Sequence, residues 1–546
     1  MSVVTPTILS EGQEMDPAYQ VLSIDVRKEV NRIPSAEIRV LDGDPSEGAF
    51  PISESTFFEP GKKIEIRLRY EEAGEDTTVF KGVVLRQGIE VDGRDATLTV
   101  EMKDEAVKMT HVRKSQVFLE KSDDKVIGEL IQNAGLQKGA LEATTPTHAE
   151  IVQYDCTDWD LMLSRADVNG LLVVADDGEI ALKKIEVTGA PAHTFELGIR
   201  EIYNLEMETD ASHQFQAVEA TAWDLKNQKS FKPVKAKAVN LSQGNLDGEK
   251  LAKTLKFEPA LLSHPVPLVS EELQAWADAR MVRSRFSMLR GRIAVAGIPD
   301  VKAMDVIEVK GLGTRFNGKT LATGVRHRVD QEGWRTDVQF GLSPKSFSRE
   351  EGIQAAPAAG LLPAVGGLQL GVVAAFEEDP DGEFRVKVKV PGIDDAEGML
   401  WARLASPDAG LERGFFFRPE VDDEVVLGFL SSDPRQPVIL GGMYGSKNKP
   451  PEDFSALSEE NIHKGIVTKK GTAIGFVDDE KASVFIQTAG ENKLLLDDDG
   501  EAVVLSDQHG NTITMNADGI EIKSAKDLIL DAGGNVEIKG SKVDVK

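Results

Sequence analysis

The C-terminal part of the chain repeats one short strand pattern and one glycine-bearing turn about every ten residues. Glycines stand at 490, 500, 510 and 519, and each ends a segment such as KLLLDDDG or NTITMNADG in which strand-forming residues precede the turn. A unit with a single strand leaves two strand edges and one apolar face without a partner. The repeat therefore allows two arrangements: a meander in which one chain folds back on itself, or several chains wound around one another.

We favour several chains, because the apolar residues of this segment are too few for the core of one chain's sheet. They suffice if three copies meet on a common axis, as in an intertwined trimeric β-prism or β-helix over residues 465–546. Strand patterns continue to the last residue, through 527–534 and 535–546. The residues expected in the trimer core are Ile513, Met515, Ile520, Ile522, Leu528, Leu530, Val536, Ile538, Val543 and Val545.

Residues 369–450 have an all-β pattern. Phe384, Val386, Val388 and Val390 alternate with basic residues, which is typical of a strand with one buried face. Two further strand patterns, EVVLGFL at 424–430 and PVILGG at 437–442, are separated by the turn SSDPRQ. Short strands that follow one another this closely in the sequence indicate a small closed barrel such as an OB-fold. A polar connector, 451–464, separates it from the repeat.

Residues 1–351 combine many strand patterns with a few helices, which predicts an α+β region dominated by β structure. Strands are expected at 35–41, 62–70, 96–102, 306–312, 321–330 and 334–340. One helix is expected to begin after Ser122 and to end at Gly135, with Val126, Ile127, Leu130 and Ile131 as its apolar stripe. Further helices are expected at 158–167 and after Ser270.

A long uncharged stretch runs from Gly352 to Phe376 and could cross a membrane as a helix. Pro357 and Pro363 lie inside it and would break that helix. We therefore expect a flexible linker at 352–368 that leads into the first strand of the barrel.

The net charge excludes two classes of partner. The chain has 63 basic and 91 acidic residues, a formal charge of −28, and such a charge repels nucleic-acid phosphates and anionic lipids. We expect neither nucleic-acid binding nor stable membrane insertion. Cys156 is the single cysteine, and the N-terminus lacks the basic and apolar regions of a secretory signal. Both features predict assembly in a reducing cytoplasm without a signal peptide.

Three sequence features match functional motifs, and we interpret each as structural. GTRFNGKT at 313–320 fits the P-loop pattern, but a strand pattern follows Lys319 and Thr320 where a phosphate-binding helix is required. Cys156 and His148 could form a thiol nucleophile and its base, although a lone cysteine in an apolar strand is usually a small core residue. The acidic turns at 379–382 and 497–500 lack the rest of a calcium loop.

The eight histidines are scattered along the chain without the spacing of a metal site. We therefore predict a protein that is not an enzyme, with no catalytic residue, no metal and no cofactor.

The three parts of the chain, in this order, resemble the VgrG-type spike proteins of contractile injection systems, which include type VI secretion and phage-tail-like particles. The most specific segments are GEFRVKVKVPG at 382–392 and GFFFRPEVDDEVVLGFLSSDPRQPVILGGMYGSKNKPP at 414–451, which resemble that family's OB domain. YDCTDWDLMLSRADVNGLLVVADDGEIAL at 154–182 and FNGKTLATGVRHRVDQEGWRTDVQFGLS at 316–343 are similar to segments of its hub. VLSIDVRKEVNRIPSAEIRVLDGD at 21–44 looks closest to the versions in extracellular phage-tail-like particles.

The resemblance implies a homotrimer with a hub of β-barrel modules at 1–351, an OB-fold collar at 369–450 and a needle at 465–546. With two similar modules in each chain, the trimer would have six positions that face the inner tube. The implied function is that of a central spike, which punctures a target envelope when an outer sheath contracts and can carry effectors. Implied partners are an Hcp-like inner tube protein, baseplate proteins and effector cargo, in a particle assembled in the bacterial cytoplasm and delivered outward.

The end of the needle predicts one more partner. A prism that stops at the C-terminus leaves open backbone groups at three strand ends. We expect a PAAR-like tip protein to bind there, at Val543, Asp544, Val545 and Lys546. Two alternatives stay open: a phage baseplate hub and spike of the same architecture, and an envelope-degrading enzyme whose active site the sequence does not reveal. The connector at 451–464 is too short for an enzyme domain.

Overall fold

The computed structural model describes residues 4–71, 75–93, 95–239, 241, 243–349, 352–393, 399–455 and 458–546. Its backbone divides into two compact units, Met1–Ala355 and Ala356–Lys546. Residue 351, the expected end of the hub, and residues 456 and 457 of the expected connector lie outside the described residues. No helix among the described residues is long and apolar enough to cross a membrane.

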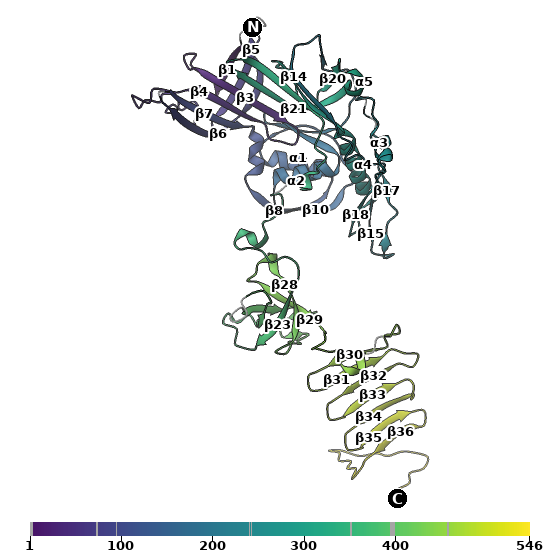
Figure 1. The fold of residues 1–546 in the computed structure, drawn as a ribbon. Coiled ribbons are helices and arrows are strands. Elements are labelled where there is room, and N and C mark those ends of the chain that lie inside the picture. Colours follow the sequence, from purple (N-terminus) through teal and green to yellow (C-terminus); the bar gives the residue numbers. More distant parts are fainter. Residues whose placement is uncertain are drawn as a thin grey trace. The chain divides into compact units, whose positions relative to one another are not determined.

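The first unit, the hub, is built on a 13-stranded sheet (Figure 1). The strands follow the order β14-β19-β22-β21-β3-β4-β7-β6-β5-β1-β2, and β20 connects β21 to β13. The bounds are β1 Val4–Ser10, β2 Gln13–Glu14, β3 Val21–Glu29, β4 Ser35–Leu41, β5 Lys63–Tyr70, β6 Thr77–Asp92, β7 Asp95–Lys103, β13 His193–Glu196, β14 Ile202–Thr209, β19 Leu289–Ala296, β20 Val306–Lys310, β21 Gly318–Asp330 and β22 Gly333–Phe340.

Alternation of apolar and polar residues explains how this sheet buries one face. In β4, Ala36, Ile38 and Val40 are buried, while the residues between them are at least partly exposed. One core gathers around Phe58 and Phe80 on the first half of the sheet, and another around Phe195 and Phe340 on the second half. The hub therefore contains two β modules within one continuous sheet.

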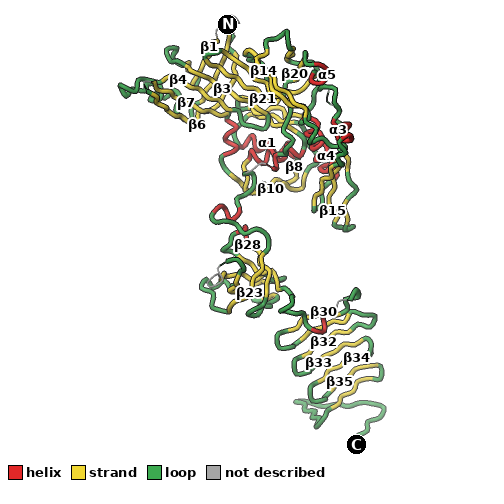
Figure 2. Tube along the Cα trace, in the orientation of Figure 1, coloured by secondary structure: helices red, strands yellow, loops and turns green. Residues whose placement is uncertain are grey.

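Helices pack beside the sheet (Figure 2). The apolar stripe expected for the first helix is confirmed, because Val126, Ile127, Leu130 and Ile131 of α1 are fully buried, and Gly135 after it has a φ of +71°. Ser122 precedes α1, but its hydroxyl donates to Asp124 rather than capping the helix. The elements here are η1 Glu105–Thr110, β8 Arg113–Lys121, α1 Asp123–Asn133, β9 Gln137–Leu141, β10 His148–Thr157, α2 Asp158–Val168, β11 Leu171–Asp176 and β12 Glu179–Lys184.

A smaller group of elements packs on α4, Ser270–Phe286, which corresponds to the helix expected after Ser270. Leu273, Ala277 and Met281 of this helix cover Val218 and Ala220 of the sheet beside it. The other elements of the group are β15 Val218–Asp224, β16 Lys229–Ser230, β17 Val234–Lys235, α3 Gly248–Thr254 and β18 Ala260–His264. The short helix α5, Gly313–Phe316, precedes β21.

The second unit begins with a closed five-stranded barrel, β23-β24-β25-β29-β28. Its strands are β23 Gln369–Ala375, β24 Val386–Lys389, β25 Met399–Leu404, β28 Glu424–Phe429 and β29 Pro437–Gly442, with a small hairpin of β26 Ala409–Gly410 and β27 Arg413–Gly414. Val386, Val388 and Val390 are buried in the barrel core, as expected. Phe384 is not: it is 81% exposed and has a φ of +55°. The alternation therefore predicts the strand two residues too early, because the chain turns at Phe384 and β24 begins at Val386.

The needle forms a seven-stranded antiparallel sheet from β30 to β36, which begins at His463, two residues before the expected start at 465. Its strands are β30 His463–Val467, β31 Ala473–Val477, β32 Ser483–Gln487, β33 Lys493–Asp497, β34 Ala502–Ser506, β35 Thr512–Asn516 and β36 Gly519–Lys523. Each strand pairs with the next along the chain. Within one chain these strands adopt the meander, one of the two arrangements that the repeat allows.

Residues 527–546 correct one expectation. They carry the same strand patterns as the preceding residues, but no strand forms among them in the single chain. A strand needs a hydrogen-bonded neighbour, and in the single chain residues 527–546 pair with no other strand. The expected core residues Leu528, Leu530, Val536, Ile538, Val543 and Val545 therefore lie in irregular backbone and are all exposed.

Candidate functional site: the apolar face of the needle

The strand pairing of β30–β36 places apolar side chains opposite one another, so that they form continuous rows along one face of the needle sheet. Leu494 of β33 lies opposite Leu505 of β34, and Leu505 lies opposite Ile513 of β35. Ile513 in turn lies opposite Ile522 of β36. Because residues two apart share a face, each strand contributes a pair of such side chains. The face comprises Ile466, Ile474, Phe476, Val484, Ile486, Leu494, Leu496, Val503, Leu505, Ile513, Met515, Ile520 and Ile522.

This apolar face is uncovered in the single chain. Leu505 is 50% exposed, Ile513 37% and Ile520 71%. A contiguous apolar surface of this length on an isolated chain marks a site of association. The structure brings together the expected core residues Ile513, Met515, Ile520 and Ile522, but the face begins well before them, at Ile466. The earlier residues show the same alternation in the sequence, and that signal could have identified them.

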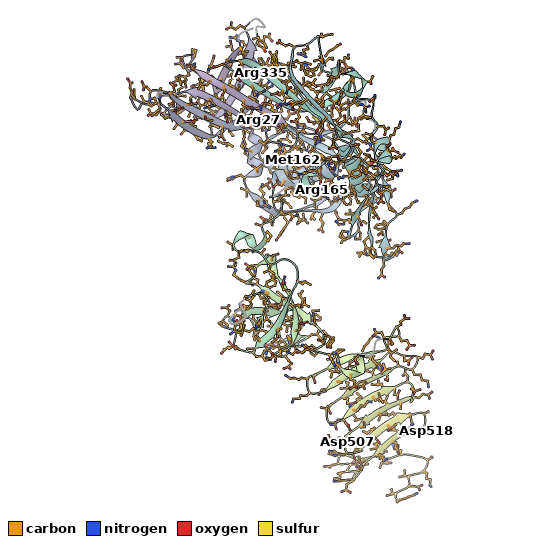
Figure 3. The ribbon with its side chains drawn as sticks, in the orientation of Figure 1. Arg27, Met162, Arg165, Arg335, Asp507 and Asp518 are labelled. Atoms are coloured by element: carbon orange, nitrogen blue, oxygen red, sulfur yellow. The ribbon has the colours of Figure 1, made fainter. Side chains whose placement is uncertain are left out.

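The opposite face of the needle sheet is polar in β35 and β36, but its middle row in β32, β33 and β34 is apolar and consists of Phe485, Leu495 and Val504. Thr512 and Thr514 of β35 lie on it, opposite Lys523 and Glu521 of β36. Its one large aromatic residue, Phe485, covers Gly475, where a Cβ would lie 2.3 Å from the ring. Turns rich in aspartate connect the strands, and Figure 3 marks two of these residues, Asp507 and Asp518. The needle sheet therefore has one face that is apolar along its whole length and one that is more polar.

The expected tip-binding residues lie at the end of the irregular segment. Val543 is 55% exposed and Val545 93% exposed. The carboxylate of Asp544 pairs with the ammonium of Lys542, 2.6 Å away. The structure neither joins these residues to the apolar face nor buries them.

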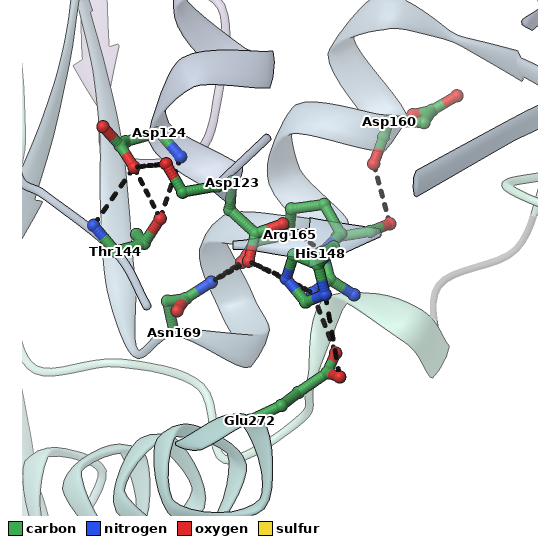
Figure 4. Close-up of polar contacts among 10 residues, drawn as sticks. Asp123, Asp124, Thr144, His148, Asp160, Arg165, Asn169 and Glu272 are labelled. Carbon is green, nitrogen blue, oxygen red and sulfur yellow. Dashed lines mark hydrogen bonds and ion pairs between the residues drawn. The ribbon is translucent and has the colours of Figure 1, made fainter. Parts of the chain in front are cut away.

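A buried polar cluster in the hub joins four segments far apart in the sequence (Figure 4). The Arg165 guanidinium of α2 donates through Nε to Asp123 Oδ1 at 2.6 Å and through Nη2 to Glu272 Oε1 at 3.0 Å. His148 Nε2 lies 3.4 Å from Asp123 Oδ2, and Asn169 Nδ2 donates to the same oxygen at 2.8 Å. Burial by itself lowers the pKa of Arg165, but the hydrogen bonds and charges of Asp123 and Glu272 outweigh it and raise that pKa.

The cluster has a structural explanation. Asp123 is 1% exposed, and a buried carboxylate needs a paired cation and further hydrogen bonds. Arg165 is the paired cation, and Asn169 donates one of the further hydrogen bonds. Sequence analysis did not identify this cluster, because its members come from α1, β10, α2 and α4.

The other residues singled out in the sequence lie apart from one another. His148 belongs to the buried cluster, while Cys156 is half-buried in β10 and burial raises the pKa of its thiol. A protonated thiol is a weak nucleophile. Asp379 accepts from Arg385 Nε and Nη2 at 2.9 and 2.6 Å, and this contact holds its pKa far below the usual range. Among the described residues, no group of acidic, histidine and cysteine side chains could hold a metal ion.

The P-loop match runs from the short helix α5 into the first residues of β21. Thr320 is fully buried within β21, and Lys319 Nζ donates to the carbonyl of Gly189 at 3.0 Å. Neither residue lies at the N-terminus of a helix. The match therefore lacks the backbone that makes a P-loop a phosphate site.

This geometry predicts that the chain does not bind ATP through Lys319. Titration of wild-type protein and of Lys319→Ala with Mg-ATP, followed by calorimetry, should show no saturable binding in either. Micromolar binding by the wild type that disappears in Lys319→Ala would contradict this interpretation of the motif.

Comparison with known proteins gives relatives along most of the chain. Over 488 residues, 84% of this chain, it is 22% identical to the type VI secretion system spike protein VgrG1c of Pseudomonas aeruginosa. Over 197 residues, 34% of this chain, it is 26% identical to the actin cross-linking toxin VgrG1 of Vibrio cholerae. The chain spans 64% and 17% of the lengths of these relatives, less than two thirds in both. A tail protein of prophage MuSo2 from Shewanella oneidensis matches 64% of this chain and 98% of its own, with 13% identity and a TM-score of 0.45.

Three families match successive parts of the chain. Residues 369–444 match the type VI secretion system/phage-baseplate injector OB domain, and residues 483–546 match the phage baseplate V C-terminal trimerisation domain. With the closed barrel and the needle sheet, these matches define a VgrG-type spike protein of the contractile injection systems. Residues 1–331, more than half of the chain, match the Alg8 N-terminal domain, and the chain belongs to that family.

Proposed function

We propose that three copies of this chain form the central spike of a contractile injection machine, which punctures a target envelope and can carry effectors. The observation that carries the proposal is the apolar face from Ile466 to Ile522, uncovered along the whole needle sheet. The match of residues 483–546 to a trimerisation domain supports three as the number of copies. In this proposal the ten expected core residues face the other two copies, and residues 527–546 gain strand partners from them.

The proposal assigns a mechanical role to each part. The hub, 1–351, contacts an Hcp-like inner tube and baseplate proteins. The barrel, 369–450, forms a collar, and the needle, 465–546, forms the piercing end, with linkers at 352–368 and 451–464. The particle assembles in the bacterial cytoplasm and acts outward, and the chain itself catalyses no reaction.

Loss of the chain from its host tests this role. Electron microscopy of sheath–tube particles should show none that are complete, and a plasmid copy of the wild-type chain should restore them. Complete particles with full injection activity in its absence would contradict the proposal.

We propose that a PAAR-like tip protein binds residues 543–546, where the apolar side chains of Val543 and Val545 are exposed. Deleting these residues should abolish co-purification of the tip protein with the full chain. Alanine at Asp478, Asp479 and Glu480, in the turn between β31 and β32, is the control and should leave co-purification unchanged. Equal recovery with the truncated chain would place the tip protein elsewhere.

A further inference from the structure

The needle strand β33 has opposite charges at its two ends. Its sequence is KLLLD, with Lys493 at the first position and Asp497 at the last. Residues two apart in a strand share a face, so both charged side chains lie with Leu495 on the face opposite the apolar face. Both are partly exposed. The charges therefore stand at the two edges of the needle sheet, outside the expected trimer core.

Neither charge has an ion-pair partner opposite it in the sheet. The residues opposite Lys493 and Asp497 in β32 and β34 are all uncharged: Gln487, Ser506, Ser483 and Ala502. Lys493 Nζ lies 5.3 Å from the centre of the Phe485 ring, and Asp497 Oδ1 accepts from the Asp499 amide at 3.1 Å. Four residues of extended strand, about 13 Å, separate Lys493 from Asp497, so the two cannot pair within one chain.

The turns at the two edges of the needle sheet differ in charge in the same sense. The meander places successive turns at alternate edges (Figure 1). The edge with Asp497, here called the acidic edge, has turns at 478–482, 498–501 and 517–518, with the charged residues Asp478, Asp479, Glu480, Lys481, Asp498, Asp499, Glu501 and Asp518. The edge with Lys493, here called the lysine edge, has turns at 468–472, 488–492 and 507–511, with the charged residues Lys469, Lys470, Glu491 and Asp507. One edge is thus strongly negative, and the other is not.

The length of the strands determines how many copies can enclose the apolar face. Each of β30–β36 has five residues, which span about 17 Å. Three such walls in a triangle lie about 5 Å from the central axis, half of the distance of about 10 Å at which sheets pack face to face. Four walls would lie about 8 Å from the axis and leave a hollow. Three copies with their apolar faces turned inward therefore fill the prism.

Symmetry about the needle axis determines which edges meet at the three corners of this prism. In a cyclic arrangement each contact joins two different surfaces head to tail. The acidic edge of one copy therefore lies against the lysine edge of the next. Because rotation does not shift a copy along the axis, β33 lies at the same height in all three copies.

We infer that at each corner Lys493 of one copy pairs with Asp497 of the next, so that three β33 strands form a closed ring with three ion pairs. The partner is a copy within the trimer proposed above, and the inference rests on that proposal. The same corners disfavour a wrong arrangement. A copy whose needle ran antiparallel would bring an acidic edge against an acidic edge, and like charges destabilise such a contact.

Charge reversal in the full chain tests the pairing. Lys493→Glu and Asp497→Lys each place like charges at all three corners, and each should lower the association constant of the trimer about tenfold at low salt. Sedimentation equilibrium at the urea concentration that half dissociates the wild-type trimer measures this constant. The loss should shrink in about 1 M salt, because exposed charges are then screened.

The double variant, Lys493→Glu with Asp497→Lys, provides the decisive measurement. It restores opposite charges at every corner and should return the association constant to within about twofold of the wild type. Because the two residues are too far apart to pair within one chain, this rescue requires a second copy. Glu521→Lys is the matched control, since it reverses a charge opposite Thr514 in the middle of β36, away from the corners. It should leave the association constant unchanged.

Single variants that associate as the wild type does, a double variant that stays as weak as either single one, or an equal loss in Glu521→Lys would refute the pairing while the proposed trimer stands. A wild-type chain that is monomeric by mass would refute both. Circular dichroism without urea verifies that each variant keeps its β structure, so that a loss of association reports on the corners.

Discussion

Ile513→Asp is expected to dissociate the trimer, because it places a carboxylate in the middle of the apolar face from each of three copies. The cost of moving an ion out of water is several kcal/mol even after relaxation. For three copies it is on the order of 10 kcal/mol, which corresponds to several orders of magnitude in the association constant. Analytical ultracentrifugation at micromolar concentration should therefore show mostly monomer.

The neighbouring residue provides the control for this variant. Thr512 lies in the same strand on the polar face, opposite Lys523. Thr512→Asp adds the same charge beside that ammonium and should leave the trimer intact. Dissociation by both variants, or by neither, would show that the apolar face does not hold the copies together.

Arg165→Ala is expected to lower the free energy of unfolding of the hub by about 3–5 kcal/mol, since removal of one partner leaves a buried charge uncompensated. Asp123, which is 2% exposed at its side chain, would lose its paired cation, and Glu272 would lose a 3.0 Å contact. Denaturant unfolding followed by tryptophan fluorescence measures the change.

An exposed ion pair in the same unit provides the comparison. Lys184 and Glu142 pair at 2.9 Å with both side chains about half exposed. Lys184→Ala should therefore change the free energy of unfolding far less than Arg165→Ala does. A similar, small effect of both substitutions would mean that the buried cluster does not stabilise the hub.

Local patterns predicted those parts of the fold in which neighbouring residues in the sequence decide the structure. The stripe from Val126 to Ile131 specifies its helix, and the alternation from Val386 to Val390 specifies a barrel strand. Phe384 was predicted wrongly because its backbone turns at a positive φ, which the alternation does not reveal. Residues 527–546 have strand patterns, but in the single chain they pair with no other strand and form none.

The functional surfaces also fall into those that local sequence patterns predict and those that depend on tertiary packing. The alternation of apolar and polar residues predicts the apolar face of the needle. The predicted core begins at Ile513, whereas the face in the structure begins at Ile466. The cluster of Asp123, His148, Arg165 and Glu272 depends on tertiary packing, and no spacing in the sequence connects its members.

The mass of the full-length chain in solution tests the central claim most directly. Native mass spectrometry or light scattering of the purified wild-type protein should give three times the 59.3 kDa of one chain, across a wide range of concentrations. A stable, fully folded monomer at micromolar concentration would contradict the account, because the apolar face of the needle would then remain in water.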